Sequence, residues 1–219
     1  MKLQSCLVML IPVLLALPGR AQQRFAEGTI TYAVSIEQGN SGQPASAVTG
    51  TFQLTLKDKQ YIKELQLSSG FRNVIIFNTA DNKAYSLRRI QGKKYAIQLD
   101  AEELKKKQHA CMPVLMEDMP ADGQAISGFS AARKKVSCGK AEPLILYYST
   151  KWSMPDPDLF QNFPGFSYLP LRYDIRNEDG SILHFELQKI EAKPIDNGAF
   201  RIPQDHKLIS NEEYRQIGR

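Results

Sequence analysis

Two short segments of the sequence place a nucleophile near residues that could activate it. The run Gly128-Phe129-Ser130-Ala131-Ala132 is one glycine short of the Gly-x-Ser-x-Gly turn that exposes a hydrolase serine. His109 and Cys111 are two residues apart, a spacing that could pair a thiol with an imidazole base. No helix pattern follows Ser130, and nothing in the pattern orients His109. We therefore interpret Ser130 as a strand residue, assign no catalytic residue and expect a protein that is not an enzyme.

Metal-binding patterns are equally weak. The 3 histidines, at positions 109, 184 and 206, lack the HExxH spacing of a zinc site or a similar arrangement. Asp156-Pro157-Asp158 could offer carboxylate oxygens to a hard cation, although the same residues suit a turn or a helix cap. The sequence also lacks a glycine-rich phosphate-binding loop, so we predict neither a metal nor a cofactor.

Residues 152–171 form the most unusual segment. Its four prolines predict that it is not a central strand, and its large apolar side chains predict that it is not a solvated loop. We expect it to cover the concave face of the protein, where it either completes the core or roofs an apolar pocket. In both cases Phe160, Phe163 and Phe166 should be mostly buried. The candidate ligand-binding residues are Trp152, Phe160, Phe163, Phe166 and Tyr168.

Residues 1–21 have the pattern of a secretory signal peptide. A basic start at Met1-Lys2 precedes the apolar run at 7–17 and the small-residue site Gly19-Arg20-Ala21. The apolar run is shorter than the roughly 20 residues that span a bilayer, and no cysteine near the cut could carry a lipid anchor. We predict cleavage after Ala21, a mature chain that starts at Gln22, and a periplasmic or secreted location.

Two cysteines, Cys111 and Cys138, remain after the predicted cut. An isolated pair in an oxidising compartment is a candidate disulfide. The alternative is two separate buried thiols, because free cysteine packs as a small hydrophobic residue.

Composition sets the class of protein. The 219 residues are 42% hydrophobic, with 28 Lys+Arg against 23 Asp+Glu, which excludes a disordered chain, a collagen and a multi-span membrane protein. The length suits a single domain over residues 22–219. The net charge is +5 for the full chain; cleavage after Ala21 would remove Lys2 and Arg20 and leave 26 − 23 = +3, which is too mild to indicate nucleic-acid binding. Basic runs at 88–89, 93–94, 105–107 and 133–135 indicate a solvated face or, alternatively, a rim that meets anionic membrane headgroups.

The elements that would position these residues are mostly strands. Apolar and polar residues alternate from 28 to 36 and from 48 to 56, and turn signals recur every 8–12 residues, which predicts an antiparallel meander. One helix is expected at 101–108, capped by Asp100, and a second could start at Ser210 with Glu213. The sheet should end near residues 200–203. Further strands are expected at 60–67, 73–78, 84–90, 94–99, 114–116, 129–136, 144–149, 171–175 and 182–190.

The ordered motifs resemble a family of secreted bacterial proteins. They are Gly28-Thr29-Ile30-Thr31-Tyr32, Ile126-Ser127-Gly128-Phe129, Tyr148-Ser149-Thr150-Lys151-Trp152, Phe163-Pro164-Gly165-Phe166 with Pro170-Leu171, and Phe200-Arg201-Ile202-Pro203. Together they resemble the domain-of-unknown-function family 4412, which is related to LolA/LolB-like half-barrels. This resemblance implies a curved antiparallel sheet with short helices and a loop across the concave face. It also implies an envelope location, and the LolA-like relatives carry lipid-linked cargo.

We therefore expect a mainly β (α+β) fold, a half-barrel with a Pro/aromatic-rich loop over its concave face. The leading hypothesis is non-enzymatic binding of a hydrophobic or lipid-like ligand in the periplasm or envelope. The alternative is a structural or protein-interaction domain whose own side chains fill the concave face. A hydrolase or thiol enzyme is the third reading.

Overall fold

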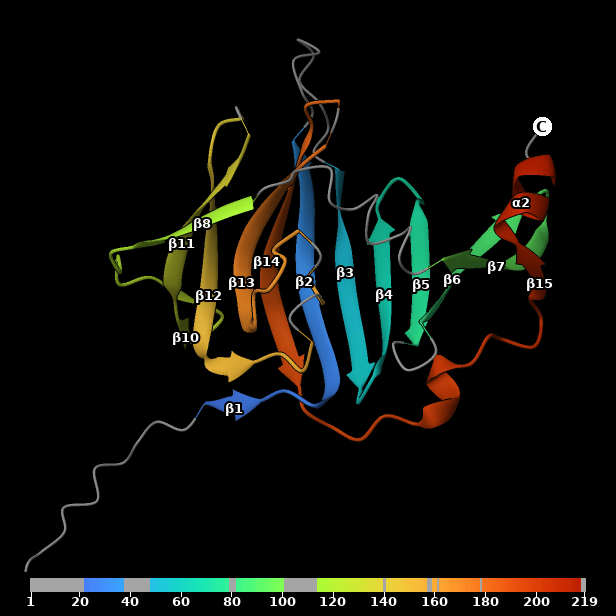
Figure 1. The fold of residues 1–219 in the computed structure, drawn as a ribbon, viewed down its shortest axis with the longest axis horizontal. Helices are drawn as coiled ribbons and strands as arrows, with labels where there is room; N and C mark the ends of the chain where they lie inside the picture. The colour runs from blue at the N-terminus through green and yellow to red at the C-terminus, as the bar shows by residue number, and fades with distance from the viewer. Residues whose placement is uncertain are drawn as a thin grey trace, which may run out of the picture.

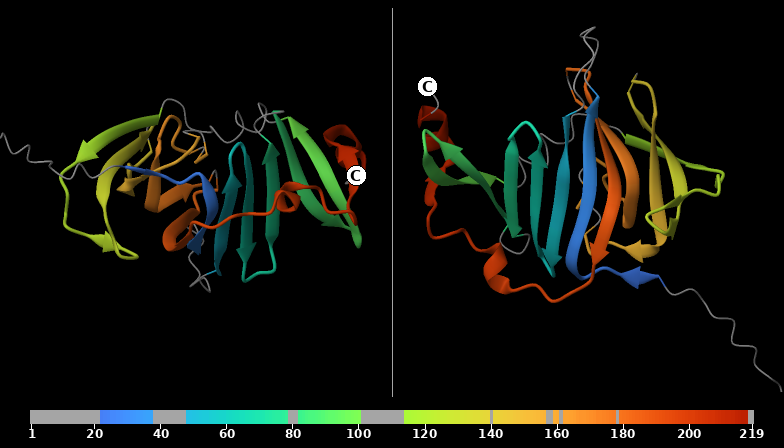
Figure 2. Two further views of the ribbon diagram at one scale, coloured as in Figure 1. Left: turned by 90° about the horizontal axis from the view of Figure 1, so that it is seen from below. Right: turned by 180° about the vertical axis from the view of Figure 1, so that it is seen from behind.

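The computed structural model describes residues 22–37, 48–78, 82–100, 114–139, 141–156, 159–160, 162–177 and 179–217. They form one large curved sheet, seen from its concave side in Figure 1 and from two further directions in Figure 2. Its first strands are β1 (Gln23–Arg24), β2 (Glu27–Glu37), β3 (Val48–Lys57), β4 (Gln60–Leu67), β5 (Arg72–Asn78), β6 (Lys83–Ile90) and β7 (Lys93–Asp100). The later ones are β8 (Val114–Met119), β11 (Ala132–Cys138), β12 (Leu144–Ser153), β13 (Tyr168–Arg176), β14 (Ile182–Glu191) and β15 (Lys207–Ser210).

The strand order is β15-β7-β6-β5-β4-β3-β2-β14-β13-β12-β11-β8, and β1 lies beside β12. The short pairs β1–β12 and β15–β7 are parallel, and the long neighbouring pairs are antiparallel, as in β2–β3 and β13–β14. This order confirms the expected antiparallel meander over β2–β7. The order is open-ended, running from β15 at one edge to β8 at the other, which agrees with the expected half-barrel.

Cross-strand pairing explains which residues face the concave side. Tyr32 pairs with Phe52, and Phe52 pairs with Leu65, so these apolar side chains lie on one face because paired residues share a face. Tyr32 is fully buried, and its hydroxyl donates a hydrogen bond of 2.9 Å to the carbonyl oxygen of Pro170. The alternating residues of β2 and β3, such as Thr51, lie on the outer face.

The prediction that no central strand occurs between 152 and 171 is wrong at both ends. Trp152 belongs to β12, and Tyr168 begins β13, which lies between β12 and β14. Pro170 is tolerated inside β13 because the β12–β13 register shifts between Tyr147 and Tyr148, the residue opposite Pro170. A bulge interrupts the ladder there, and no donor is required of the proline nitrogen.

The remaining residues, 154–167, connect β12 to β13, and we call them the covering segment. Figure 1 shows this segment in front of the sheet, over its concave side. The predicted burial is confirmed, because Phe160, Phe163 and Phe166 are 6%, 3% and 4% exposed.

A tight hairpin, β9 (Ala125–Ile126) and β10 (Phe129–Ser130), contains the sequence that approaches a nucleophile turn. Ser127 and Gly128 have φ angles of 49° and 80°, and a two-residue hairpin turn of this kind needs positive φ at both positions. Gly128 is therefore a hairpin residue. Ser130 lies in a strand, as predicted, and no helix follows it.

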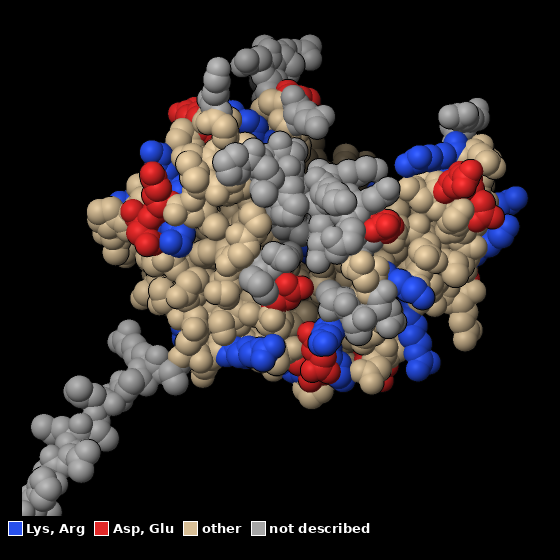
Figure 3. All heavy atoms as spheres, in the orientation of Figure 1, with Lys and Arg blue, Asp and Glu red and all other residues tan. Residues whose placement is uncertain are grey.

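The basic run at 133–135 is neutralised within the sheet. Arg133 pairs with Asp122 at 2.9 Å, and Lys135 pairs with Glu117 at 3.5 Å. Lys134 contacts Asp118 at 2.5 Å. Figure 3 shows acidic and basic side chains interspersed around the concave side. Run 105–107 lies outside the described residues, and contact with an anionic membrane stays a prediction.

The C-terminal part differs from the expected end of the sheet near 200–203. Those residues leave the 3-10 helix η1 (Asn197–Phe200) and lead to the edge strand β15. The predicted terminal helix is present as α2 (Asn211–Ile217). The predicted helix at 101–108 lies outside the described residues, and its expected cap, Asp100, is the last residue of β7.

Two further observations concern export and the membrane. Cys138 is disulfide-bonded, whereas Cys111 lies outside the described residues, so their pairing stays a prediction. Within the described part of the chain, no helix has the length and hydrophobicity needed to cross a bilayer.

Candidate functional site

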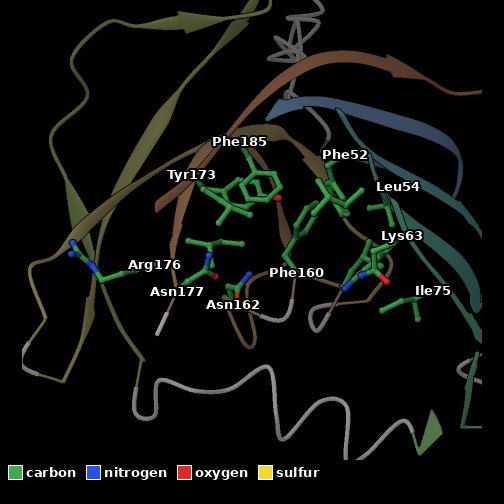
Figure 4. A pocket seen from close by; sticks show the side chains of 15 residues that line it. Phe52, Leu54, Lys63, Ile75, Phe160, Asn162, Tyr173, Arg176, Asn177 and Phe185 are labelled. Carbon is green, nitrogen blue, oxygen red and sulfur yellow. The ribbon is translucent and has the colours of Figure 1, made fainter. Parts of the chain in front are cut away.

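The concave face holds a cavity of about 360 Å³. Strands β3, β4, β5, β13 and β14 supply most of its wall, and Leu159, Phe160 and Asn162 of the covering segment supply the rest. Figure 4 shows the labelled side chains around this space. The lining residues are Phe52, Leu54, Lys63, Leu65, Asn73, Ile75, Leu159, Phe160, Asn162, Tyr173, Ile175, Arg176, Asn177, Leu183 and Phe185.

Aromatic rings form the central part of the wall. Tyr173 and Phe185 stack with their centroids 4.7 Å apart and an interplanar angle of 4°. Phe52 meets Phe185 edge-on at 5.7 Å. Phe160 meets both Tyr32 and Tyr173 edge-on, at 6.2 and 6.0 Å. These geometries are favourable for aromatic pairs, so the wall and its cover hold one another in place.

Burial changes the acidity of the two tyrosines beneath the cover. Removal of water raises the pKa of Tyr32 well above its usual value, and Tyr173 raises it further. Burial likewise raises the pKa of Tyr173. Both phenols therefore stay neutral at physiological pH, and the aromatic wall contributes no negative charge.

Lys63 lines the cavity, and the sequence motifs did not predict it as a site residue. It pairs across the sheet with Leu54 and Ile75, so its side chain points to the apolar inner face. Its ammonium lies 5.4 Å from the centre of the Tyr61 ring and 5.5 Å from that of Phe77, within cation–π range. Burial lowers the pKa of Lys63 to about 7, although the charge of Asp156 acts in the opposite direction.

The sequence contains a pattern that could have identified Lys63 as a site residue. In the run of residues 60–67, the inner positions are Tyr61, Lys63, Leu65 and Leu67. A lysine in the apolar register of a strand is unusual, because lysine is rarely buried without a partner. The inner face of β2–β5, where every residue is described, carries no other charged side chain.

Polar groups mark two further points of the lining. Asn73 has a buried side-chain oxygen without a hydrogen-bond partner among the described residues. Such a group is costly unless something binds it. Arg176, the last residue of β13, and Asn177 after it are exposed. Figure 4 shows Asn177 across the cavity from Lys63, whereas the Arg176 side chain points away from the cavity.

Of the five residues predicted to bind a ligand, the structure places Phe160 in the cavity wall. Phe163 packs edge-on against Tyr173 at 5.4 Å. Phe166 packs against Tyr148 at 5.2 Å, and Tyr168 packs against the same ring at 5.3 Å.

Trp152 lies apart from this group. Its ring meets Phe25 at 5.8 Å, and its indole nitrogen is buried without a hydrogen-bond partner in the described part of the chain. Phe163 and Phe166 therefore belong to the core, and Trp152 and Tyr168 are partly buried against it. Ligand contact by these four residues stays a prediction.

The other candidate residues that the structure describes do not line this cavity. His109 and Cys111 lie outside the described residues, as do Pro157 and Asp158. His184 is on β14, where it contacts Asp174 at 2.8 Å and Glu37 at 3.3 Å. Its cross-strand partner is Ser35 of the outer face, so this polar group faces away from the cavity.

Comparison with known proteins places the chain only coarsely. No protein-family model matches it, and no curated protein matches it. Among solved structures, MucB matches 83% of the chain at 10% identity and a TM-score of 0.40, and the chain covers 60% of MucB. PNGF-II matches 87% at 11% identity and a TM-score of 0.40, with 33% of PNGF-II covered.

A LolA superfamily protein from Nitrosomonas europaea is also similar, over 83% of this chain and 92% of its own, at 7% identity and a TM-score of 0.40. The chain thus spans less than two thirds of MucB and of PNGF-II. The expected resemblance to LolA-like proteins agrees with the presence of this neighbour, whereas no family model supports the narrower resemblance to family 4412.

Proposed function

We propose that this protein binds a hydrophobic or lipid-like ligand in the concave cavity and does not catalyse a reaction on it. The observation that carries the proposal is the cavity of about 360 Å³, walled mainly by apolar and aromatic side chains. Small-molecule sites of about 300–1,000 Å³ typically combine such a wall with a few polar groups. Lys63 and Asn73 are polar groups of this kind.

The binding experiment uses a neutral apolar fluorophore, N-phenylnaphthylamine, whose emission rises when it leaves water. Leu65 lines the cavity, and Leu65→Trp should fill it and abolish the fluorescence increase. Gln66 is exposed on the other face of the same strand, so Gln66→Trp is the matched control and should bind as the wild type does. Equal binding by Leu65→Trp, with an unchanged thermal transition, would place the fluorophore elsewhere and reject the proposal.

Export is the second part of the proposal. It is supported by the signal-peptide pattern of residues 1–21 and by the disulfide at Cys138, since disulfides persist in oxidising compartments. N-terminal sequencing of the protein recovered from the envelope or medium should start at Gln22. Recovery of protein that retains Met1 would contradict cleavage.

A protein-interaction domain is the second candidate. Of the five predicted ligand-binding aromatics, Phe163 and Phe166 are buried in the core away from the cavity wall, as expected for a concave face filled by its own side chains. Leu115 on the edge strand β8 is 58% exposed, and Ile145 on the interior strand β12 is 39% exposed. An exposed apolar residue on an edge strand suits a protein partner. This candidate gains if the wild type fails to bind the fluorophore and Leu115→Lys changes its elution volume in the presence of envelope extract.

A further inference from the structure

The charged side chains in the described lining of the cavity are all cationic. Its described lining contains two cations, Lys63 and Arg176, and no carboxylate. Lys63 is set among apolar neighbours on the inner face, whereas Arg176 is exposed and its side chain points away from the cavity. Neither side chain forms an ion pair with a described residue. The cavity therefore offers an apolar wall with a cation on its inner face. The carboxylate whose charge acts on Lys63 is that of Asp156, which lies outside the lining.

From this arrangement we propose that the ligand is a single-chain anionic amphiphile, with its head group at Lys63 and its chain along the aromatic wall. This inference rests on the proposed binding function and names its ligand class. The volume of about 360 Å³ is near the lower end for ligand sites, which favours one chain over a two-chain lipid.

Asn73 supports this orientation independently. It lies two residues from Ile75, the cross-strand neighbour of Lys63, so both side chains share the inner face. Its buried oxygen lacks a donor among the described residues. A hydroxyl or amide on the head group would satisfy this oxygen while the anion approaches Lys63.

The state of Lys63 supplies a second readout. With a pKa of about 7, the amine is partly neutral above that pH, and an anion beside it favours the protonated form. The ionisable groups that face it are Asp156 from the covering segment, Tyr61 on its own strand, and Tyr173 and Arg176 across the cavity. Binding of an anionic head at pH 8 should therefore take up a proton, whereas a neutral head should not.

The test compares dodecanoate, dodecanol and dodecyltrimethylammonium as competitors for bound N-phenylnaphthylamine, below their micelle concentrations. The wild type should bind dodecanoate about tenfold more tightly than dodecanol, and the cation most weakly. Lys63→Met keeps a long apolar side chain and should bind dodecanoate and dodecanol equally. Lys63→Arg keeps the charge and should retain most of the preference. Lys135 is exposed, pairs with Glu117 and lies in another part of the sheet, so Lys135→Met should leave all affinities unchanged.

Calorimetry in two buffers of different ionisation enthalpy measures the proton uptake. At pH 8, dodecanoate binding should be accompanied by the uptake of about one proton by the wild type and of none by Lys63→Met. Equal affinity of dodecanoate for the wild type and Lys63→Met would overturn the anionic head group, while dodecanol binding would still support the apolar site. Failure of all three competitors and of the fluorophore would overturn the proposed function and this inference with it.

Discussion

The two halves of the concave face are covered differently. Over β12 and β13, the covering segment inserts Phe163 and Phe166 among buried residues such as Leu146 and Leu171, which are 1% and 0% exposed. Over β3–β5, the segment reaches the sheet with Leu159 and Phe160 and leaves a cavity. We call the first region the filled half and the second the open half.

The difference follows from where the covering segment is attached. It leaves the end of β12 and returns to the start of β13, and these strands are neighbours. A loop tied at two nearby points covers its own strands closely and reaches a distant strand with its tip alone. Prolines and aromatic rings thus identify a cover, but connectivity decides which part of the sheet stays open.

The largest expected effect is in the filled half. Phe163→Ala removes a buried ring that packs on Tyr173 and Phe166 and should cost about 3–5 kcal/mol of unfolding free energy. Its affinity for N-phenylnaphthylamine should not change, because Phe163 is not part of the cavity wall. Urea unfolding and fluorophore titration on the same variant measure both quantities.

Phe160→Ala is the matched change in the open half. Phe160 already borders empty space, so fewer packing contacts are lost and the cost should be smaller, about 2 kcal/mol. The fluorophore should bind more weakly to this variant. The comparison between the halves breaks if the two variants lose equal stability and equal affinity.

Lys63→Met should produce the next largest effect, and in the opposite direction. Burial disfavours the ammonium, so its replacement by an apolar side chain should stabilise the protein at pH 6. Because Lys63 is only partly buried, water offsets part of this effect, and the gain should be smaller than the loss in Phe160→Ala. The cross-strand neighbours Leu54 and Ile75 can pack against methionine without rearrangement. Thermal unfolding of both proteins at pH 6 measures this gain.

The contribution of Lys63 to the free energy of unfolding should change with pH in a defined direction. The pKa of Lys63 is about 7 in the folded protein and roughly 10.4 in an unfolded chain, so the unfolded state binds more protons between these values. Wild-type stability should therefore gain from this residue as pH rises from about 7 to about 10.4. The advantage of Lys63→Met should shrink over the same window. A constant difference across that range would mean that Lys63 is well solvated, and the open half would lose its distinctive charge.

Most of the sheet could be predicted from the sequence because period-two alternation records which face is buried. The strands at 28–36, 48–56 and 60–67 lie within β2, β3 and β4 to within a residue or two. The capping pair at Ser210 and Glu213 likewise marks α2. These signals are local, so they survive without knowledge of the tertiary structure.

The site depended on long-range information. Pro170 reads as a strand breaker, but the β12–β13 bulge accommodates it, and a bulge is set by the partner strand. The aromatic cover could be predicted from the sequence, yet Trp152 and Tyr168 lie in strands and Phe163 and Phe166 are buried away from the cavity wall. Lys63 was visible as a charge in an apolar register, although its meaning depends on Tyr173 and Phe160, which lie more than ninety residues further along the chain.

The smallest expected effect tests whether the outer edge of the open half matters to the cavity. The Ser210 hydroxyl accepts a hydrogen bond from the Glu213 amide at 3.1 Å, and the Glu213 carboxylate accepts one from the Ser210 amide at 2.7 Å. This capping box begins α2, whose Tyr214 packs against a small cluster of Tyr95, Ile97 and Ile209. Ser210→Ala should cost about 1 kcal/mol, whereas Ser210→Thr, which preserves a capping hydroxyl, should cost less. Hydrogen exchange should show faster opening of α2 while fluorophore affinity stays unchanged. Strands β7, β6 and β5 separate the edge strand β15 from β4, which carries Lys63. A loss of affinity in Ser210→Ala comparable to that in Leu65→Trp would therefore show that the cavity depends on the whole sheet, and it would remove the boundary between the open half and this edge.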